Sequence, residues 1–171
     1  MKEEKSITRL RFKDDSGNDF PEWDTKILSE ITDYVDYRGK TPAKKEYGVF
    51  LLTAKNIKQG YIDYEVSKEY ISGDDYDEVM RRGKPKLGDV LITTEAPLGN
   101  VASIDREDVA LAQRVIKFRG KTNILQNSFL KHCLMSPNFQ KEIDEKSSGS
   151  TAKGIKGSEL HKIQISFPCL A

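Results

Sequence analysis

The segment KLGDVLITTEAPLGNVASI, residues 86–104, contains two short apolar runs that are rich in β-branched residues. Runs of this length, bounded by glycine, proline and charged residues, are typical of β-strands. The segment therefore predicts strands at 89–94 and 101–104, and Gly99 between them is compatible with a tight hairpin.

The sequence on both sides of this segment predicts further strands and a few helices. Runs of β-branched and aromatic residues predict strands at 49–53, 61–64, 114–118 and 162–167. Helices are expected from Asp24 or Thr25 to about Val35, from Asn127 or Ser128, from Ser136-Pro137, and over a short stretch, 74–82, that Ser72 could cap. Because the strands come in runs and do not alternate regularly with helices, the pattern indicates an α+β fold with a mixed or antiparallel sheet.

Length and composition are those of one globular domain. The 171 residues can form a single core, with residues 1–20 as a polar N-terminal extension and the Gly/Ser/Lys stretch 147–158 as one mobile loop. The longest purely apolar run, Val49 to Leu52, is too short to span a membrane. The N-terminus lacks the apolar centre of a secretory signal, and the two cysteines give no disulfide framework. We therefore expect a cytoplasmic protein with no membrane partner.

Charge is unevenly distributed along the chain, although the net charge is only +1. Residues 38–58 carry six Lys or Arg residues and one Glu, whereas residues 59–80 carry seven Asp or Glu residues and one Lys. This segregation would permit a basic face for nucleic acid behind a nearly neutral total. Charges that are segregated along the sequence need not lie on separate faces of the folded protein. A basic face and a surface of mixed charge therefore both stay open at this point.

The motifs of common catalytic and cofactor sites are absent. The sequence has no GxGxxG or GxxxxGK[ST] loop, and no Asn/Asp-Pro-Pro-aromatic motif of the kind that grips a flipped base in a methyltransferase. Zinc ligands would have to come from His132, Cys133, His161 and Cys169, whose spacing fits no usual zinc pattern. The densest carboxylates, Asp74 to Glu78, would suit either a metal-dependent nuclease or a solvated helix start, and the helix start is favoured. We expect no catalytic residue and no metal.

Seven segments, read in order along the chain, form a recognisable series. The most recognisable of them is 86–104, in which Gly-Asp precedes a strand and a second glycine follows about ten residues later. The others are Trp23 with Leu28 and Ile31, YRGKTP (37–42), GVFLLTAKNIKQGYID (48–63), ALAQRVIKFRG (110–120), SFLKHCLMSPNFQKEI (128–143) and GSTAKGIKGSELHKIQISFP (149–168). In this order the segments resemble the target-recognition domain of the specificity subunit of type I restriction-modification systems. The resemblance covers about residues 20 to 168 and implies a recognition domain at 21–168.

This resemblance implies that the chain reads double-stranded DNA as one half of a specificity subunit. The modification subunit would bind S-adenosylmethionine and methylate adenine at N6, and the restriction subunits would cleave, so this chain itself needs no cofactor. In the family the last strand leads into a link and a long helix that docks the modification subunits. Here the sequence stops at FPCLA, so residues 169–171 are expected to be the truncated start of that link.

The resemblance also directs attention to polar residues in the loops beside the strands. Arg and Lys suit guanine or phosphate, and Asn and Gln suit adenine. Asn56 is the favoured base reader, with Lys55 and Lys58 as phosphate contacts. The other candidates are Arg38, Lys40, Thr41, Thr94, Asn100, Gln113, Arg114, Ser150, Thr151, Lys153 and Lys156, with Glu95 as a further acceptor.

Each candidate also has a purely structural interpretation. Lys55 to Lys58 and the YRGKTP loop can be simple turns, Gln113 and Arg114 can be polar residues of an edge strand, and 147–158 can be a free linker. The tyrosines at 34, 37, 47, 61 and 64 are expected to be mostly core or sheet residues. The alternative function is that of a fragment that pairs with a partner subunit without reading DNA.

Overall fold

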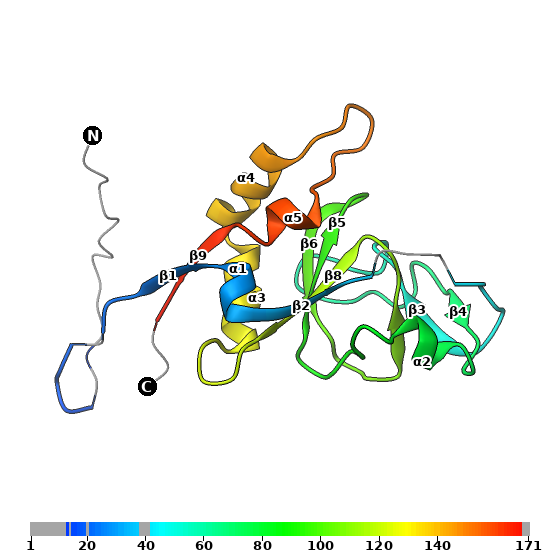
Figure 1. The fold of residues 1–171 in the computed structure, drawn as a ribbon, viewed down its shortest axis with the longest axis horizontal. Helices are drawn as coiled ribbons and strands as arrows, with labels where there is room; N and C mark the ends of the chain where they lie inside the picture. The colour runs from blue at the N-terminus through cyan, green and yellow to red at the C-terminus, as the bar shows by residue number, and fades with distance from the viewer. Residues whose placement is uncertain (1–12, 14, 20, 38–41, 169–171) are drawn as a thin grey trace.

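The computed structural model describes residues 13, 15–19, 21–37 and 42–168 and has a four-stranded antiparallel sheet at its centre (Figure 1). The strand order is β2 (Thr32–Asp36), β8 (Val115–Gly120), β5 (Val90–Thr94), β6 (Leu98–Ser103). The segment 86–104 supplies the paired strands β5 and β6, with Ile92 opposite Val101. The expected α+β fold with mixed or antiparallel sheets is confirmed.

Both faces of this central sheet are buried. Val90 and Ile92 belong to one apolar cluster, whereas Leu91 between them belongs to another. Since successive side chains of a strand point to opposite faces, an unbroken apolar run is what a sheet covered on both sides requires. The single core expected from chain length is therefore divided by the sheet into two apolar clusters.

Four helices cover the first face: α1 (Leu28–Ile31), α3 (Asn127–Met135), α4 (Pro137–Lys146) and α5 (Gly157–Leu160). The two longer helices begin where the sequence predicted. Ser136 caps α4, because its Oγ accepts a hydrogen bond from the Phe139 N–H at 3.3 Å. Within the described part of the chain, no helix is long and apolar enough to cross a membrane.

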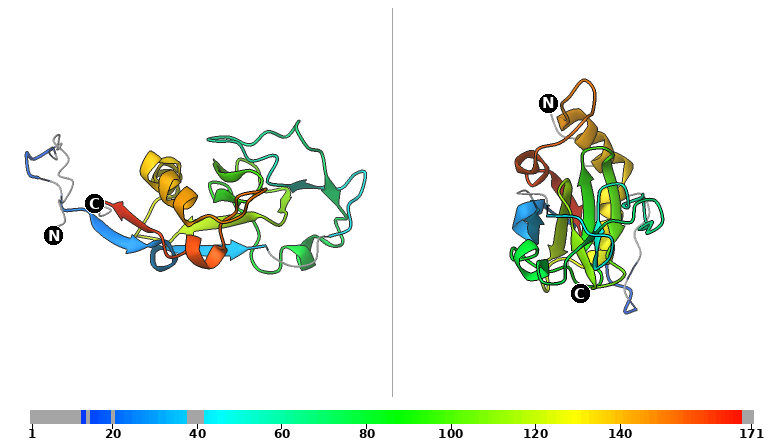
Figure 2. Two further views of the ribbon diagram at one scale, coloured as in Figure 1. Left: turned by 90° about the horizontal axis from the view of Figure 1, so that it is seen from above. Right: turned by 90° about the vertical axis from the view of Figure 1, so that its right-hand side faces the viewer.

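A second, smaller sheet covers the other face (Figure 2). Its strands are β4 (Tyr70–Ile71), β3 (Val49–Leu52) and β7 (Val109–Leu111), and β3 pairs with β7 in parallel. The strand predicted at 49–53 is confirmed, but 61–64 contains only the isolated bridge between Ile57 and Ile62. The short helix α2 (Tyr76–Val79) lies within the expected 74–82 stretch. Ser72 does not cap it directly; its hydroxyl accepts from the Asp74 N–H at 3.3 Å.

The helix predicted from Asp24 or Thr25 to Val35 is wrong. The structure has β1 (Asp24–Ile27), the single turn α1, and then β2. Strand pairing overrides the helical pattern here: β1 pairs with β9 (Gln164–Phe167), and β2 pairs with β8. The Leu28 N–H donates to the Ile163 carbonyl at 3.0 Å, so the backbone of this segment is satisfied by distant partners.

Candidate functional site

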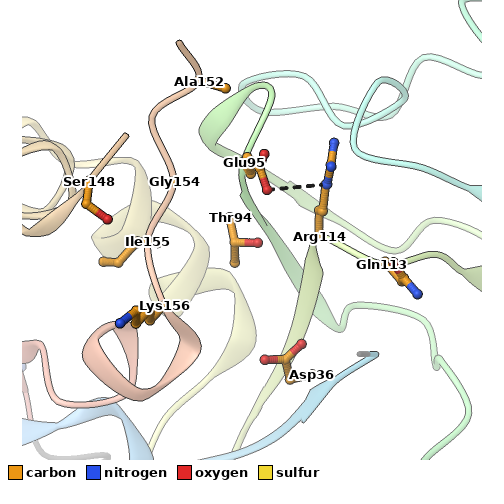
Figure 3. Close-up of a pocket in the computed structure, with 10 residues that line it drawn as sticks. All are labelled: Asp36, Thr94, Glu95, Gln113, Arg114, Ser148, Ala152, Gly154, Ile155 and Lys156. Atoms are coloured by element: carbon orange, nitrogen blue, oxygen red, sulfur yellow. Dashed lines mark ion pairs between the residues drawn. The ribbon is translucent and has the colours of Figure 1, made fainter. Parts of the chain in front are cut away.

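A surface pocket of about 550 Å³ lies where β5 ends and β8 begins (Figure 3). Four of the residues predicted to contact DNA line it together, although they lie far apart in the sequence: Thr94, Gln113, Arg114 and Lys156. The other lining residues are Asp36, Glu95, Ser148, Ala152, Gly154 and Ile155. Three strand ends and one loop thus form a single polar pocket.

The turn into β8 fixes the backbone at Arg114. Its φ is 68°, in the left-handed region that side-chain-bearing residues rarely adopt, and its carbonyl accepts from the Thr94 N–H at 2.9 Å. The Arg114 Nε lies 3.4 Å from Glu95 Oε2, and the two side chains are 56% and 38% exposed. An ion pair this exposed adds little stability, so its charges remain available to a ligand.

The stretch 147–158, expected to be a mobile loop with a free linker as the alternative, is folded onto the end of β5. Ser148 and Gly154 exchange two backbone hydrogen bonds of 2.9 Å, and the Ile155 N–H donates to the Thr94 carbonyl at 3.0 Å. Gly149 makes this closure possible: its φ is +119°, and a Cβ there would lie 2.2 Å from the Ala152 carbonyl oxygen. The loop therefore brings exposed Lys156 to the pocket from a distant part of the chain.

Other predicted residues of this loop lie outside the pocket. Ser150 and Thr151 are exposed, and Lys153 Nζ pairs with Asp144 of α4 at 2.5 Å. Arg38, Lys40 and Thr41 fall outside the described residues.

Asn56, the favoured base reader, is fully buried. Its Oδ1 accepts from the N–H and hydroxyl of Thr53 at 3.0 and 2.8 Å. Its Nδ2 donates to the carbonyls of Asp63 and Ser67 at 2.9 and 2.8 Å. Because the whole amide is used inside the protein, the prediction is corrected: Asn56 holds the 53–67 segment together. The neighbouring Lys55 is exposed and Lys58 half-buried, and neither lines the pocket.

Asn100 is corrected for a similar reason. Its Nδ2 donates to the Ile57 carbonyl at 2.8 Å, and its N–H donates to Thr93 Oγ1 at 2.9 Å. Gln59 reinforces this link, because its Oε1 accepts from the Val101 N–H at 3.0 Å. Asn100 thus fastens the 57–60 loop to β6 and lies outside the pocket.

The Gly-Asp pair at 88–89 has a structural role that the sequence analysis did not identify. Asp89 is fully buried and accepts from Arg119 Nε and Nη2 at 2.6 and 2.7 Å, with Lys117 Nζ at 3.5 Å. Burial lowers the pKa of Lys117, partly offset by Asp89, while the hydrogen bond to Asp89 raises the pKa of Arg119. The sequence did contain a signal for this buried charge cluster, because Lys117 and Arg119 alternate with apolar residues in β8 and share one face.

No metal site is found in the described ranges, where no three His, Cys, Asp or Glu side chains group together. Burial raises the pKa of the Cys133 thiol to about 11, and His161 stacks on Tyr34 with a centroid separation of 3.6 Å. In the acidic cluster, Asp77 and Glu78 pair with Lys84 and Arg81. The carboxylates of Asp77 and Glu78 therefore have structural partners.

The structure changes two further expectations, one on the charge distribution and one on the tyrosines. Lys44 pairs with Glu69 at 2.8 Å, so the basic and acidic segments meet at this point and are not fully segregated. Tyr37 is buried, as expected of a core residue, but Tyr47 and Tyr61 are 83% and 60% exposed. The expectation that the tyrosines are mostly core or sheet residues is wrong for these two, which lie outside the strands.

A family model described as the type I restriction modification DNA specificity domain matches residues 21–171. No curated protein matches the sequence. Among solved structures, the HsdS subunit from Thermoanaerobacter tengcongensis is 18% identical, with a TM-score of 0.59 over 87% of this chain and 34% of its own length. The S subunit of a type I restriction-modification system from M. genitalium is 15% identical, with a TM-score of 0.57 over 93% and 36%.

A chain from a structural study of complex assembly and conformational transition in the type I R-M system has a TM-score of 0.60 at 18% identity. The match covers 93% of this chain and 37% of that one. The chain thus spans about a third of the length of these three solved structures. At such low identity the likeness shows a shared fold.

Proposed function

Because the chain belongs to the family of type I restriction modification DNA specificity domains, we propose that it reads a short double-stranded DNA sequence as one half of a specificity subunit. The observation that carries this proposal is the convergence of Thr94, Gln113, Arg114 and Lys156 on one surface pocket. These residues come from strand ends and from one docked loop, so the fold holds them in place before any ligand binds.

The pocket offers the chemistry that duplex DNA requires. Arginine and glutamine side chains form paired hydrogen bonds with purine edges, and threonine and glutamate supply further acceptors. Lysine adds affinity through phosphate without regard to sequence. In this assignment Gln113, Arg114 and Thr94 face the bases, Glu95 lies beside Arg114, and Lys156 faces the backbone. Lys55 and Lys58 remain candidate phosphate contacts outside the pocket.

The catalytic steps belong to partner subunits in this proposal. A modification subunit binds S-adenosylmethionine, extrudes an adenine and methylates N6, and restriction subunits cleave DNA. The present chain selects the DNA sequence and contributes no catalytic group or cofactor.

The test is selection of duplexes from a randomised DNA pool by the purified chain at low salt, followed by sequencing of the bound fraction. We expect enrichment of one short contiguous motif and an affinity that falls steeply as salt rises. Arg114→Ala should alter the motif, whereas Arg81→Ala should not, because Arg81 is an exposed residue beside α2 that pairs with Glu78 away from the pocket. If no motif is enriched and the DNA affinity does not change with salt, the result would instead favour the protein-interaction alternative.

A further inference from the structure

The ion pair between Glu95 and Arg114 is made through the Nε side of the guanidinium. Glu95 Oε2 approaches Arg114 from the Nε side, at 3.4 Å. Figure 3 shows the terminal nitrogens of Arg114 continuing beyond this contact, away from the Glu95 carboxylate. The two terminal groups therefore form an outward-facing pair of donors, and the side chain that carries them is 56% exposed.

Both partners of the pair are held by their backbones. The left-handed φ of 68° at Arg114 sets the direction of its side chain, and the Arg114 carbonyl is bonded to the Thr94 N–H. Glu95 forms an isolated bridge with Gly154, where an added Cβ would lie only 3.4 Å from Glu95 Cγ. The bridge to the docked loop thus holds the backbone of Glu95 beside Arg114.

The charge of the pair distinguishes it from a phosphate contact. A carboxylate beside the guanidinium makes the pair neutral overall, which weakens attraction to a phosphate. Hydrogen bonding to a base edge keeps its directional strength, and guanine N7 and O6 accept two parallel donors from one arginine. Lys156 in the same pocket is exposed and forms none of the ion pairs found among the described residues. It keeps the uncompensated charge that suits phosphate.

We propose that Arg114 reads the guanine of one G·C pair in the recognised sequence through its two terminal guanidinium nitrogens, and that Glu95 is the positioning residue that aims them. This inference rests on the proposed function, that the chain reads duplex DNA. It adds the identity of one base pair and separates the residue that reads it from the residue that adds affinity.

The test compares motifs selected from a randomised duplex pool by the unaltered chain, Arg114→Lys, Glu95→Gln and Lys156→Ala. The unaltered chain should select a motif with guanine at one fixed position. Arg114→Lys keeps the charge but loses the planar fork, so preference for that guanine should fall about tenfold or more while other positions persist. Glu95→Gln should relax the same position. Lys156→Ala should leave the motif intact and reduce the slope of log affinity against log salt by about 1.

The outcomes separate the two levels of the proposal. A selected motif that Arg114→Lys leaves unchanged at every position would overturn the assignment of Arg114 while the proposed function stands. A change confined to an A·T position would overturn the assignment of guanine. Failure of the unaltered chain to select any motif would overturn the proposed function and this inference together. Matching thermal unfolding of the unaltered chain and the variants shows that a relaxed position does not come from misfolding.

Discussion

Asn56 and Arg114 are both polar residues next to apolar strands, yet their surroundings in the structure are opposite. The Asn56 amide makes four hydrogen bonds inside the protein, whereas the Arg114 side chain is 56% exposed at the pocket. Sequence position alone does not separate these cases, because the partners of Asn56 include carbonyls up to eleven residues away. The side chain that uses all its donors and acceptors internally is the structural one.

Replacement of Asn56 by alanine tests this assignment. The change leaves half-buried groups of Thr53, Asp63 and Ser67 without their partner, so we expect a loss of about 3 kcal/mol in the free energy of unfolding. Urea denaturation at constant m-value measures it. Lys55→Ala, at the exposed neighbouring position, should change stability by less than about 0.5 kcal/mol. Equal stabilities of the two variants would contradict the structural role of Asn56.

Tyr37 predicts a pH dependence of stability. Burial, followed by the nearby charge of Asp89, raises the pKa of Tyr37 above its usual value of 10.0. The folded state then favours the protonated phenol, so this contribution is complete below about pH 10 and is lost as pH rises above it. Between pH 10 and 11 the unaltered chain should lose stability more steeply than Tyr37→Phe, by up to about 1.4 kcal/mol per pH unit.

The measurement is urea denaturation of both proteins across that range. Between pH 7 and 9 their difference in stability should stay constant, because it then reflects only the lost hydrogen bond from the Tyr37 hydroxyl to the Gly83 carbonyl. Parallel curves up to pH 11 would show that the Tyr37 phenol titrates alike in the folded and unfolded chains.

At the scale of elements, the loop 148–154 determines whether Lys156 reaches the pocket. Its closure depends on Gly149, where φ is +119° and a Cβ would meet the Ala152 carbonyl. Gly149→Ala should open the loop and lower stability by about 1–3 kcal/mol. Hydrogen exchange at the amides of Ser148, Gly154 and Ile155 should accelerate, and DNA affinity should fall.

Gly73→Ala is the matched control for this loop variant. No atom lies within 4 Å of a Cβ built at Gly73, so the same chemical change should leave loop exchange and DNA binding unaltered. Slow exchange at 148–155 in Gly149→Ala would mean that the loop is held closed by contacts other than this turn.

The elements differ in how far the sequence predicted them. The helix start at Ser136-Pro137 was predictable because its cap is local, and the strands at 90–94 and 115–120 were predictable because β-branched and aromatic residues are concentrated in them. The 24–35 region was misassigned because its strands depend on β8 and β9, more than 80 residues away. At the site, the residue types of Thr94, Gln113, Arg114 and Lys156 were predictable. Their convergence was not, since it depends on how distant segments pack.

At the scale of the whole molecule, one sheet separates and supports both apolar clusters. Leu91 faces the second cluster and Ile92 faces the first, and both are fully buried. We therefore expect Leu91→Ala and Ile92→Ala each to cost about 3 kcal/mol and to destabilise the entire chain in a single cooperative transition.

The single tryptophan makes this measurable. Trp23 packs edge-on against Phe129 beside the helical layer, so its fluorescence reports on the first face, while far-ultraviolet circular dichroism reports on the whole chain. The two urea transitions should coincide in both variants. Val66→Ala, at a side chain that is 49% exposed, should leave the midpoint nearly unchanged. A shift of the circular dichroism transition alone in Leu91→Ala would show that the two clusters unfold separately.

The burial of both faces of the central sheet also has a consequence for evolution. The middle positions of β5 and β8 have no solvent side, so selection for folding acts on nearly every one of them. The pocket residues at the strand ends, Thr94, Glu95 and Arg114, are half-buried or exposed, so changes there disturb the interior less. Under the proposed function, a lineage with this architecture would drift in DNA sequence preference through a handful of substitutions while its folding stability stays nearly constant.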